Sequence, residues 1–227
     1  MNDPNTSQNR IIADKAEKEV MAAVGADIPG AFEKLVVLYQ KRVYQVIYQM
    51  VGNREEAEDL TQELFLRLFK ARKTYRPDYL LSTWIFTIAH NLAMNLIRDR
   101  RRTKTHLVQA PIGHGQTLRP GLADHTAISP EGTPSAQMRS LELSQVVQEA
   151  IQSLTEDQRL AIVLNKFEAM SYQQIAQIMG RSESAVKSIL SRARTNLKDQ
   201  LEAYLETGTR PSTTKKSQSP DAHGPVP

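Results

Sequence analysis

The sequence has no cysteine among its 227 residues, which excludes disulfide bonds and thiolate metal sites. It also has no N-terminal apolar segment and no uncharged apolar run of about eighteen residues, so neither secretion nor membrane insertion is expected. A reducing, cytoplasmic location is therefore predicted. Aromatic residues make up only 6% of the chain, and Trp84 is the single tryptophan.

The charge and the histidine content also limit the classes of function that the protein can have. A net charge of +4 is only mildly basic, so the position of the cations matters more than their number. The histidines show no spacing typical of a metal site or a catalytic triad, and we expect no enzyme activity, no metal and no cofactor. They are His90, His106, His114, His125 and His223.

Apolar residues recur at helical spacing through two parts of the chain, and no stretch alternates apolar and polar residues as a β-strand would. The prediction is an all-α fold with two small helical domains, at residues 27–104 and 138–206. Proline, glycine and hydroxyl residues without a period predict a flexible linker at 105–137. Residues 1–26 are predicted to form a partly helical N-terminal extension whose first dozen residues are frayed. Residues 207–227 are predicted to form a disordered tail. Asp27 is expected to cap the first long helix, with Pro29 in its first turn.

The stretch "SYQQIAQIMGRSESAVKSILSRAR", residues 171–194, predicts two helices with Gly180 at the turn between them. Ser171 with Gln174 forms a capping box at its start, as Thr155 with Gln158 does for the preceding helix. The polar side of the second helix has the hydroxyls and cations that reach bases and phosphates in a major groove. These residues are Ser184, Lys187, Ser188, Ser191, Arg192, Thr195 and Lys198. The alternative is a solvated cationic face of a helical hairpin.

An earlier helix, "AEDLTQELFLRLFK", carries an acidic and amide-bearing patch. Asp59, Gln62 and Glu63, with Phe65 and Phe69 nearby, suit docking onto a protein partner and not onto DNA. The alternative is an exposed charged face with the aromatic residues in the core.

The helix "STWIFTIAHNLAMNLIRDRRR" begins near Trp84 and ends in a basic cluster that contains Arg98, Arg101 and Arg102. Such a cluster favours phosphate binding, although a helix C-terminus also stabilises cations locally. Trp84, with Tyr75 in the preceding loop, either packs in the core or forms a stacking platform for unpaired bases.

These three stretches, in this order, resemble the extracytoplasmic-function (ECF) group of bacterial RNA polymerase sigma factors in the sigma-70 family. The similarity covers about residues 32–102, with the family's region 2, and about residues 141–201, with its region 4. It implies a region 2 bundle of three or four helices, a region 4 helix-turn-helix, and a subunit that recognises promoters and promotes their melting without being an enzyme. The "YLLSTW" stretch departs from the common family pattern and puts the minus-ten sequence preference in doubt.

The resemblance also implies partners and site residues. Asp59, Gln62, Glu63 and Phe65 would bind the clamp helices of the largest polymerase subunit, and region 4 would meet the flap of the second-largest subunit. An anti-sigma factor is a further candidate partner. The minus-ten element would be held by Tyr75, Thr83, Trp84, Ile88, Asn91, Arg98, Arg101 and Arg102. The minus-35 element would be read by Ser184, Lys187, Ser188, Ser191 and Arg192, with Arg194 on the backbone. The main rival is an autonomous helix-turn-helix regulator, which would bind its operator tightly without polymerase.

Overall fold

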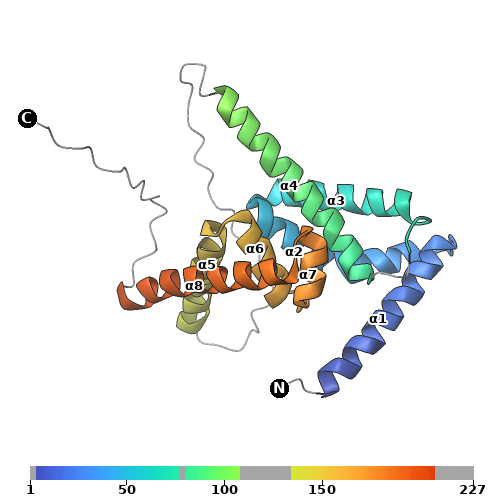
Figure 1. Ribbon diagram of the computed structural model, residues 1–227, viewed down its shortest axis with the longest axis horizontal. Helices are drawn as coiled ribbons and strands as arrows, with labels where there is room; N and C mark the ends of the chain where they lie inside the picture. Colours follow the sequence, from blue (N-terminus) through green and yellow to red (C-terminus); the bar gives the residue numbers. More distant parts are fainter. Residues whose placement is uncertain (1–3, 77–79, 108–133, 208–227) are drawn as a thin grey trace, which may run out of the picture.

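The structure is a computed structural model that describes residues 4–76, 80–107 and 134–207. Every regular element in these ranges is an α-helix, which confirms the predicted fold class (Figure 1). Most of the predicted linker and nearly all of the predicted tail lie outside the described residues. The helices are α1 (Pro4–Gly25), α2 (Ala31–Val51), α3 (Arg54–Ala71), α4 (Leu81–Leu107), α5 (Pro134–Ser153), α6 (Glu156–Lys166), α7 (Tyr172–Met179) and α8 (Glu183–Thr207).

Several helix ends follow the local rules expected from the sequence. Thr155 and Ser171 each form the predicted capping box, at the starts of α6 and α7. Gly180 ends α7 in the left-handed conformation, with φ of 62°, which a side chain would strain. Ser182 accepts a hydrogen bond of 3.2 Å from the backbone N–H of Ala185 and so caps α8. The starts of α7 and α8 and the turn at Gly180 therefore follow local sequence signals.

Three helix starts differ from the predictions. The cap of α2 is Gly30, in the left-handed region with φ of 76°, and not Asp27. The Asp27 carboxylate instead binds Lys73 at 2.7 Å and Arg72 at 2.6 Å, and these hydrogen bonds lower its pKa. Helix α1 begins at Pro4, inside the segment expected to fray, and α5 begins at Pro134, inside the predicted linker.

Helix α2 is the centre of the first domain, because α1, α3 and α4 all pack against it. Its fully buried residues Leu35, Tyr39, Val43 and Ile47 recur every four positions, which places them on one face of the helix. In the second domain, α8 packs on α5, α6 and α7.

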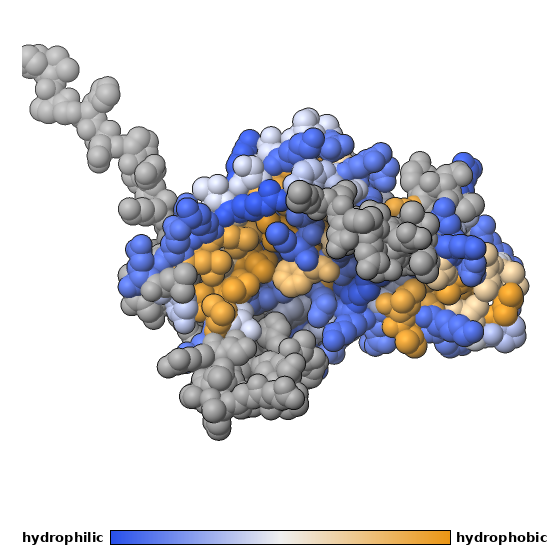
Figure 2. Space-filling model, turned by 90° about the horizontal axis from the view of Figure 1, so that it is seen from below, coloured by the Kyte–Doolittle hydropathy of each residue, from blue (hydrophilic) through white to orange (hydrophobic). Residues whose placement is uncertain are grey.

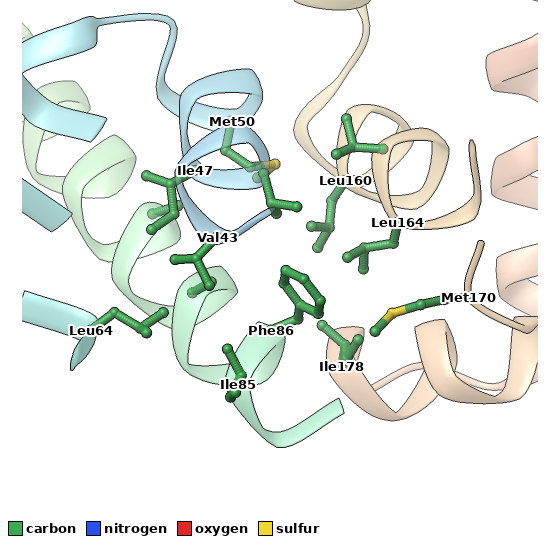
Figure 3. Close-up of a cluster of buried hydrophobic side chains, with 14 of the residues drawn as sticks. Val43, Ile47, Met50, Leu64, Ile85, Phe86, Leu160, Leu164, Met170 and Ile178 are labelled. Atoms are coloured by element: carbon green, nitrogen blue, oxygen red, sulfur yellow. The ribbon is translucent and has the colours of Figure 1, made fainter. Parts of the chain in front are cut away.

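The two domains are packed against each other and share one continuous apolar core. Helix α4 lies on α7, and α2 lies on α6. Figure 3 shows the Phe86 ring of α4 directed toward Leu160, Leu164 and Ile178 of the second domain. The sequence predicted two domains and a tether between them, but no apolar pattern indicated that the domains would meet.

Candidate functional site

The exposed side of α8 carries the polar residues expected to read DNA. Lys187, Ser188 and Arg192 are exposed, while Val186, Leu190 and Ala193 on the opposite side are buried. Ser184 and Ser191 are exposed as well. Lys187 Nζ lies 3.1 Å from the Glu183 carboxylate, which partly neutralises the first turn of the helix. The arrangement leaves a row of solvent-exposed hydroxyl and cationic groups, some of which pair within α8 or with its cap.

Arg194 has a different environment from these residues. Its Nη2 donates to the Tyr172 hydroxyl at 3.2 Å and to Asn165 Oδ1 at 3.4 Å. The hydrogen bond from Arg194 is the main cause of a lowered pKa for Tyr172. Arg194 thus joins α8 to the start of α7 and the end of α6, and no sequence pattern indicated Tyr172 as its partner.

The outer face of α3 combines polar and apolar groups. Asp59, Gln62, Leu66 and Phe69 are all exposed, and their spacing of three, four and three places them on one side of the helix. The exposed fractions of Leu66 and Phe69 are 57% and 45%, unusually high for apolar side chains of this size. Figure 2 shows exposed apolar surface at the end of the molecule that carries this domain.

Phe65 does not belong to this face. It is only 9% exposed, and its ring meets the Phe32 ring edge to face at a centroid distance of 6.5 Å. Glu63 is half-buried and pairs with Arg67 at 2.7 Å. Phe65 and Phe69 were both expected to supply apolar contact area; Phe69 is exposed and can do so together with Leu66, whereas Phe65 is buried.

The residues expected at the minus-ten element lie at the start of α4. The Tyr75 and Trp84 rings are in contact, with centroids 5.2 Å apart. Trp84 and Ile88 are half-buried and Asn91 is exposed, and the spacing of four and three places all three on one side of α4. Thr83 is only 4% exposed, and its hydroxyl is buried with no hydrogen-bond partner among the described residues. Thr83 therefore faces the protein interior.

The basic end of α4 is divided between two roles. Arg98 and Arg102 are exposed, and Arg101 pairs with Glu156 of α6. Arg100 instead pairs with Glu56 and donates to the carbonyl oxygen of Val51 at 2.9 Å, and its partial burial lowers its pKa. The cluster thus supplies both free cations and structural ones.

Two arginines at the domain contact were missed by the sequence analysis. Arg159 of α6 donates to the carbonyl oxygens of Met50, Ile151 and Leu154, at 2.9, 3.2 and 3.0 Å, and burial lowers its pKa. Arg42 of α2 binds Glu168, in the turn between α6 and α7, at 2.8 Å. The contacts that cross between the domains, from Arg159 to Met50 and from Arg42 to Glu168, join residues 109 and 126 positions apart, so no local pattern could indicate them.

Within the described segments, no helix is both long and apolar enough to cross a membrane, and no group of histidine and acidic residues is arranged to hold a metal ion. The molecule is an all-helical protein with a helix-turn-helix in one domain and an acidic and apolar helix face in the other. That combination defines a DNA-binding protein that also docks onto another protein.

Comparison with known proteins identifies the family. Residues 35–103 match the model "Sigma-70 region 2", and residues 144–197 match "Sigma-70, region 4". The ECF RNA polymerase sigma-E factor of Escherichia coli K12 is 34% identical over 176 residues, which cover 77% of this chain and 88% of that protein. The ECF sigma factor SigW of Bacillus subtilis is 32% identical over 172 residues, 75% of this chain and 89% of that protein. The chain belongs to the ECF sigma factors of the sigma-70 family.

Solved structures share the fold. CnrH, in complex with the cytosolic domain of CnrY, superimposes with a TM-score of 0.59 at 22% identity, over 83% of this chain and 98% of that one. The sigma factor RpoE of Bartonella quintana, in complex with the anti-sigma factor NepR, superimposes with a TM-score of 0.60 at 24% identity, over 76% of this chain and 98% of that one.

Membership of the family decides the general function. The chain is a sigma factor, a non-enzymatic subunit with which RNA polymerase initiates transcription at promoters. The first domain is region 2 and the second is region 4. This result decides against the autonomous regulator considered from the sequence.

Proposed function

We propose that the outer face of α3 docks this sigma factor on the clamp helices of the largest polymerase subunit. Asp59 and Gln62 supply charge and hydrogen bonds, and Leu66 and Phe69 supply apolar contact area in place of the buried Phe65. A docking surface gains most from apolar groups that are exposed before binding and buried after it. Glu63, which pairs with Arg67, contributes at the edge of this face.

Region 2 then captures the melted minus-ten element. Tyr75 and Trp84 form the aromatic surface on which an extruded base stacks, and Ile88 and Asn91 continue it along α4. Stacking of a base on an aromatic ring contributes about 1–3 kcal/mol, comparable to the cost of unstacking it from the duplex. Arg98 and Arg102 bind phosphates beside this surface, and Thr83 supports it from within.

Region 4 reads the minus-35 element with α8. The observation that carries this role is the division of α8 into a buried apolar side and an exposed side bearing Lys187, Ser188 and Arg192. Ser184 and Ser191 flank these three. Arg194 holds the helix pair in position through Tyr172 and Asn165, and region 4 as a whole meets the polymerase flap.

Two further proposals follow from the family. The protein acts in the cytoplasm, where polymerase and promoter DNA are found. An anti-sigma factor is a candidate regulator, since RpoE, which shares this fold, was solved with the anti-sigma factor NepR.

The test is run-off transcription by core polymerase on a genomic DNA library, with and without the protein. Added start sites that share one pair of upstream elements are the expected result. A variant with Lys187→Ala and Arg192→Ala should lose those sites and still bind polymerase. If the protein adds no start site, the proposal is wrong.

A further inference from the structure

His90 lies where α4 of region 2 meets the helix-turn-helix of region 4. It comes one turn after Phe86, on the same side of α4, and α4 packs on α7. Its ring forms a hydrogen bond with the backbone of Ile178, in the last turn of α7 and two residues before Gly180. Figure 3 shows Ile178 beside Phe86 at this contact. A single histidine thus joins the helix expected at the minus-ten element to the helix pair expected at the minus-35 element.

The two ring nitrogens of His90 have different environments. Nδ1 is buried and has no hydrogen-bond partner among the described residues, so Nε2 is the nitrogen that bonds to Ile178. Nδ1 is therefore the atom that takes up a second proton, and the N–H group formed there faces no acceptor in the described structure. A buried donor that has no acceptor and shares a positive charge costs free energy as long as the two domains stay packed.

The charged groups around the ring do not offset this cost. Asp157 of α6 favours the protonated ring and Arg181, after α7, disfavours it, and these two groups pair with each other at 3.0 Å. The described parts of α1, α2 and α3 also pack on α4, but they contribute no charged group that shifts the pKa of His90. Burial is the largest effect and lowers this pKa. The packed contact therefore favours a neutral His90.

Movement of region 4 away from α4 would expose the ring to water. In water the pKa of a histidine is about 6.5, so the separated form binds a proton more readily than the packed form does. The packed form is therefore favoured above that pH and loses its advantage as the pH falls. Between about pH 7.5 and about pH 5.5, the ratio of separated to packed molecules should rise by up to about tenfold, the limit for a ring that is protonated only when separated.

We infer that His90 makes the contact between region 2 and region 4 sensitive to pH, so that acidification loosens the helix-turn-helix from the minus-ten helix. The ligand of this site is a proton, which Nδ1 takes from solvent and returns as the pH rises. The change in domain contact depends only on the environment of the ring. Its effect on transcription rests on the proposed function, because that effect requires both domains to bind promoter DNA.

An NMR titration of the full chain measures the protonation of His90 directly. The signal of its Cε1–H group is identified by its absence from the spectrum of His90→Gln. We expect the midpoint of the titration to lie below the ordinary value of about 6.5, because the packed ring resists protonation. A midpoint at or above that value would overturn the inference. This measurement uses the unaltered protein and does not depend on the folding of a variant.

The reactivity of a buried thiol reports how often the two domains separate. The chain has no cysteine, so Ile178→Cys places a single thiol beside Phe86. Its protection from 4,4′-dithiodipyridine is measured relative to the exposed Asp199→Cys at each pH, which cancels the pH dependence of the reagent. We expect the protection to fall three- to tenfold from about pH 7.5 to about pH 5.5, while circular dichroism shows unchanged helicity.

Two histidine variants control this experiment. In the Ile178→Cys protein, a further His90→Gln substitution keeps a neutral polar side chain at position 90, and protection should then change less than about twofold over the same range. His106→Gln alters another histidine of α4 and should leave the full pH response. Equal losses of protection with and without His90→Gln would overturn the inference, as would a protection that does not depend on pH.

Transcription at limiting core polymerase connects the contact to function. The ratio of run-off product made with the unaltered protein to that made with His90→Gln, taken at each pH, cancels the pH dependence of polymerase itself. This ratio should rise about two- to fourfold from about pH 7.5 to about pH 6.0. A constant ratio would overturn the effect on transcription. If neither protein initiates at either pH, the proposed function fails, while the titration and the thiol protection still decide whether His90 makes the contact sensitive to pH.

Discussion

Arg159 in α6 donates a hydrogen bond of 2.9 Å to the main-chain carbonyl oxygen of Met50, at the end of α2. The same guanidinium also binds the carbonyl oxygens of Ile151 and Leu154. A single side chain from region 4 thus satisfies the carbonyls at the end of α5 and one at the end of a region 2 helix. Carbonyls in the last turn of a helix generally lack a partner within the helix, although Ile151 also accepts from the Leu154 N–H at 3.2 Å.

Replacing Arg159 with methionine should therefore destabilise the protein. The variant keeps much of the side-chain volume but leaves several partly buried carbonyl oxygens without a donor, and we expect a loss of about 2–4 kcal/mol in the free energy of unfolding. Urea denaturation followed by circular dichroism measures it. The control is Arg192→Met on the exposed side of α8, expected to change stability by no more than about 0.5 kcal/mol. Equal stabilities of the two variants would contradict the assignment.

The division of α3 into an exposed and a buried side predicts opposite consequences for neighbouring residues. Leu66→Ser with Phe69→Ser should weaken binding to core polymerase at least tenfold, about 1.4 kcal/mol. Its loss of stability should be smaller than that of Phe65→Ala, although the Phe69 ring also contacts Phe32 at 5.1 Å and Arg72 at 4.1 Å. Phe65→Ala should lower the free energy of unfolding by about 3–5 kcal/mol, because it leaves a cavity beside Phe32. Biolayer interferometry against core polymerase measures the binding of each variant, and parallel denaturation curves measure its stability.

The polar residues of the same face should behave like Leu66 and Phe69. Asp59→Ala with Gln62→Ala is expected to reduce polymerase binding while helicity stays unchanged, because both side chains are exposed. Unchanged polymerase affinity of this variant would remove α3 as the docking surface.

Arg192 is expected to contribute to sequence discrimination. Its replacement by alanine should reduce the preference for the cognate minus-35 element over a single-base mismatch by about 1–3 kcal/mol. Lys198, further along α8, pairs with Glu202 at 3.4 Å and is the matched control. Lys198→Ala should lower affinity for all sequences alike, if at all. Competition assays with the assembled polymerase holoenzyme measure both. An undiminished preference in Arg192→Ala would exclude it as a reader.

His90 predicts a pH dependence of stability. It lies on α4 against the backbone of Ile178, with Asp157 and Arg181 nearby, and burial lowers its pKa below the ordinary value of about 6.5. Below that value the unfolded chain binds more protons than the folded one, so the free energy of unfolding should fall as pH decreases from about 8 to about 5.5. The loss should begin as the pH approaches the ordinary pKa of about 6.5 from above and should continue below it.

The test compares this pH dependence with that of His90→Gln. The variant should show a smaller loss of stability between the two pH values, because one group that protonates only on unfolding or opening has been removed. Denaturation curves across the range measure the difference. Parallel curves for the two proteins would show that His90 does not contribute.

Much of the secondary structure could be predicted from the sequence because it depends on interactions between residues close together in the chain. Capping boxes at Thr155 and Ser171, the glycine turn at Gly180 and the apolar spacing of α2 depend on residues a few positions apart. The predicted start of α2 was wrong because it depended on distant residues. Asp27 is a good capping residue, but Arg72 and Lys73, more than forty positions along the chain, bind its carboxylate instead. The exposed side of α8 was predictable because helical periodicity alone separates it from the buried side.

The sequence by itself determined the all-helical class, the order of the helices and the family, since each depends on local pattern and on three motifs in succession. The tertiary structure alone decided that region 2 and region 4 meet, that Phe65 is buried while Leu66 and Phe69 are exposed, and that Arg42 and Arg159 link the domains. The physical reason is that these contacts join residues about a hundred or more positions apart or depend on which side of a helix a neighbour covers. Periodicity within one helix carries no information about either.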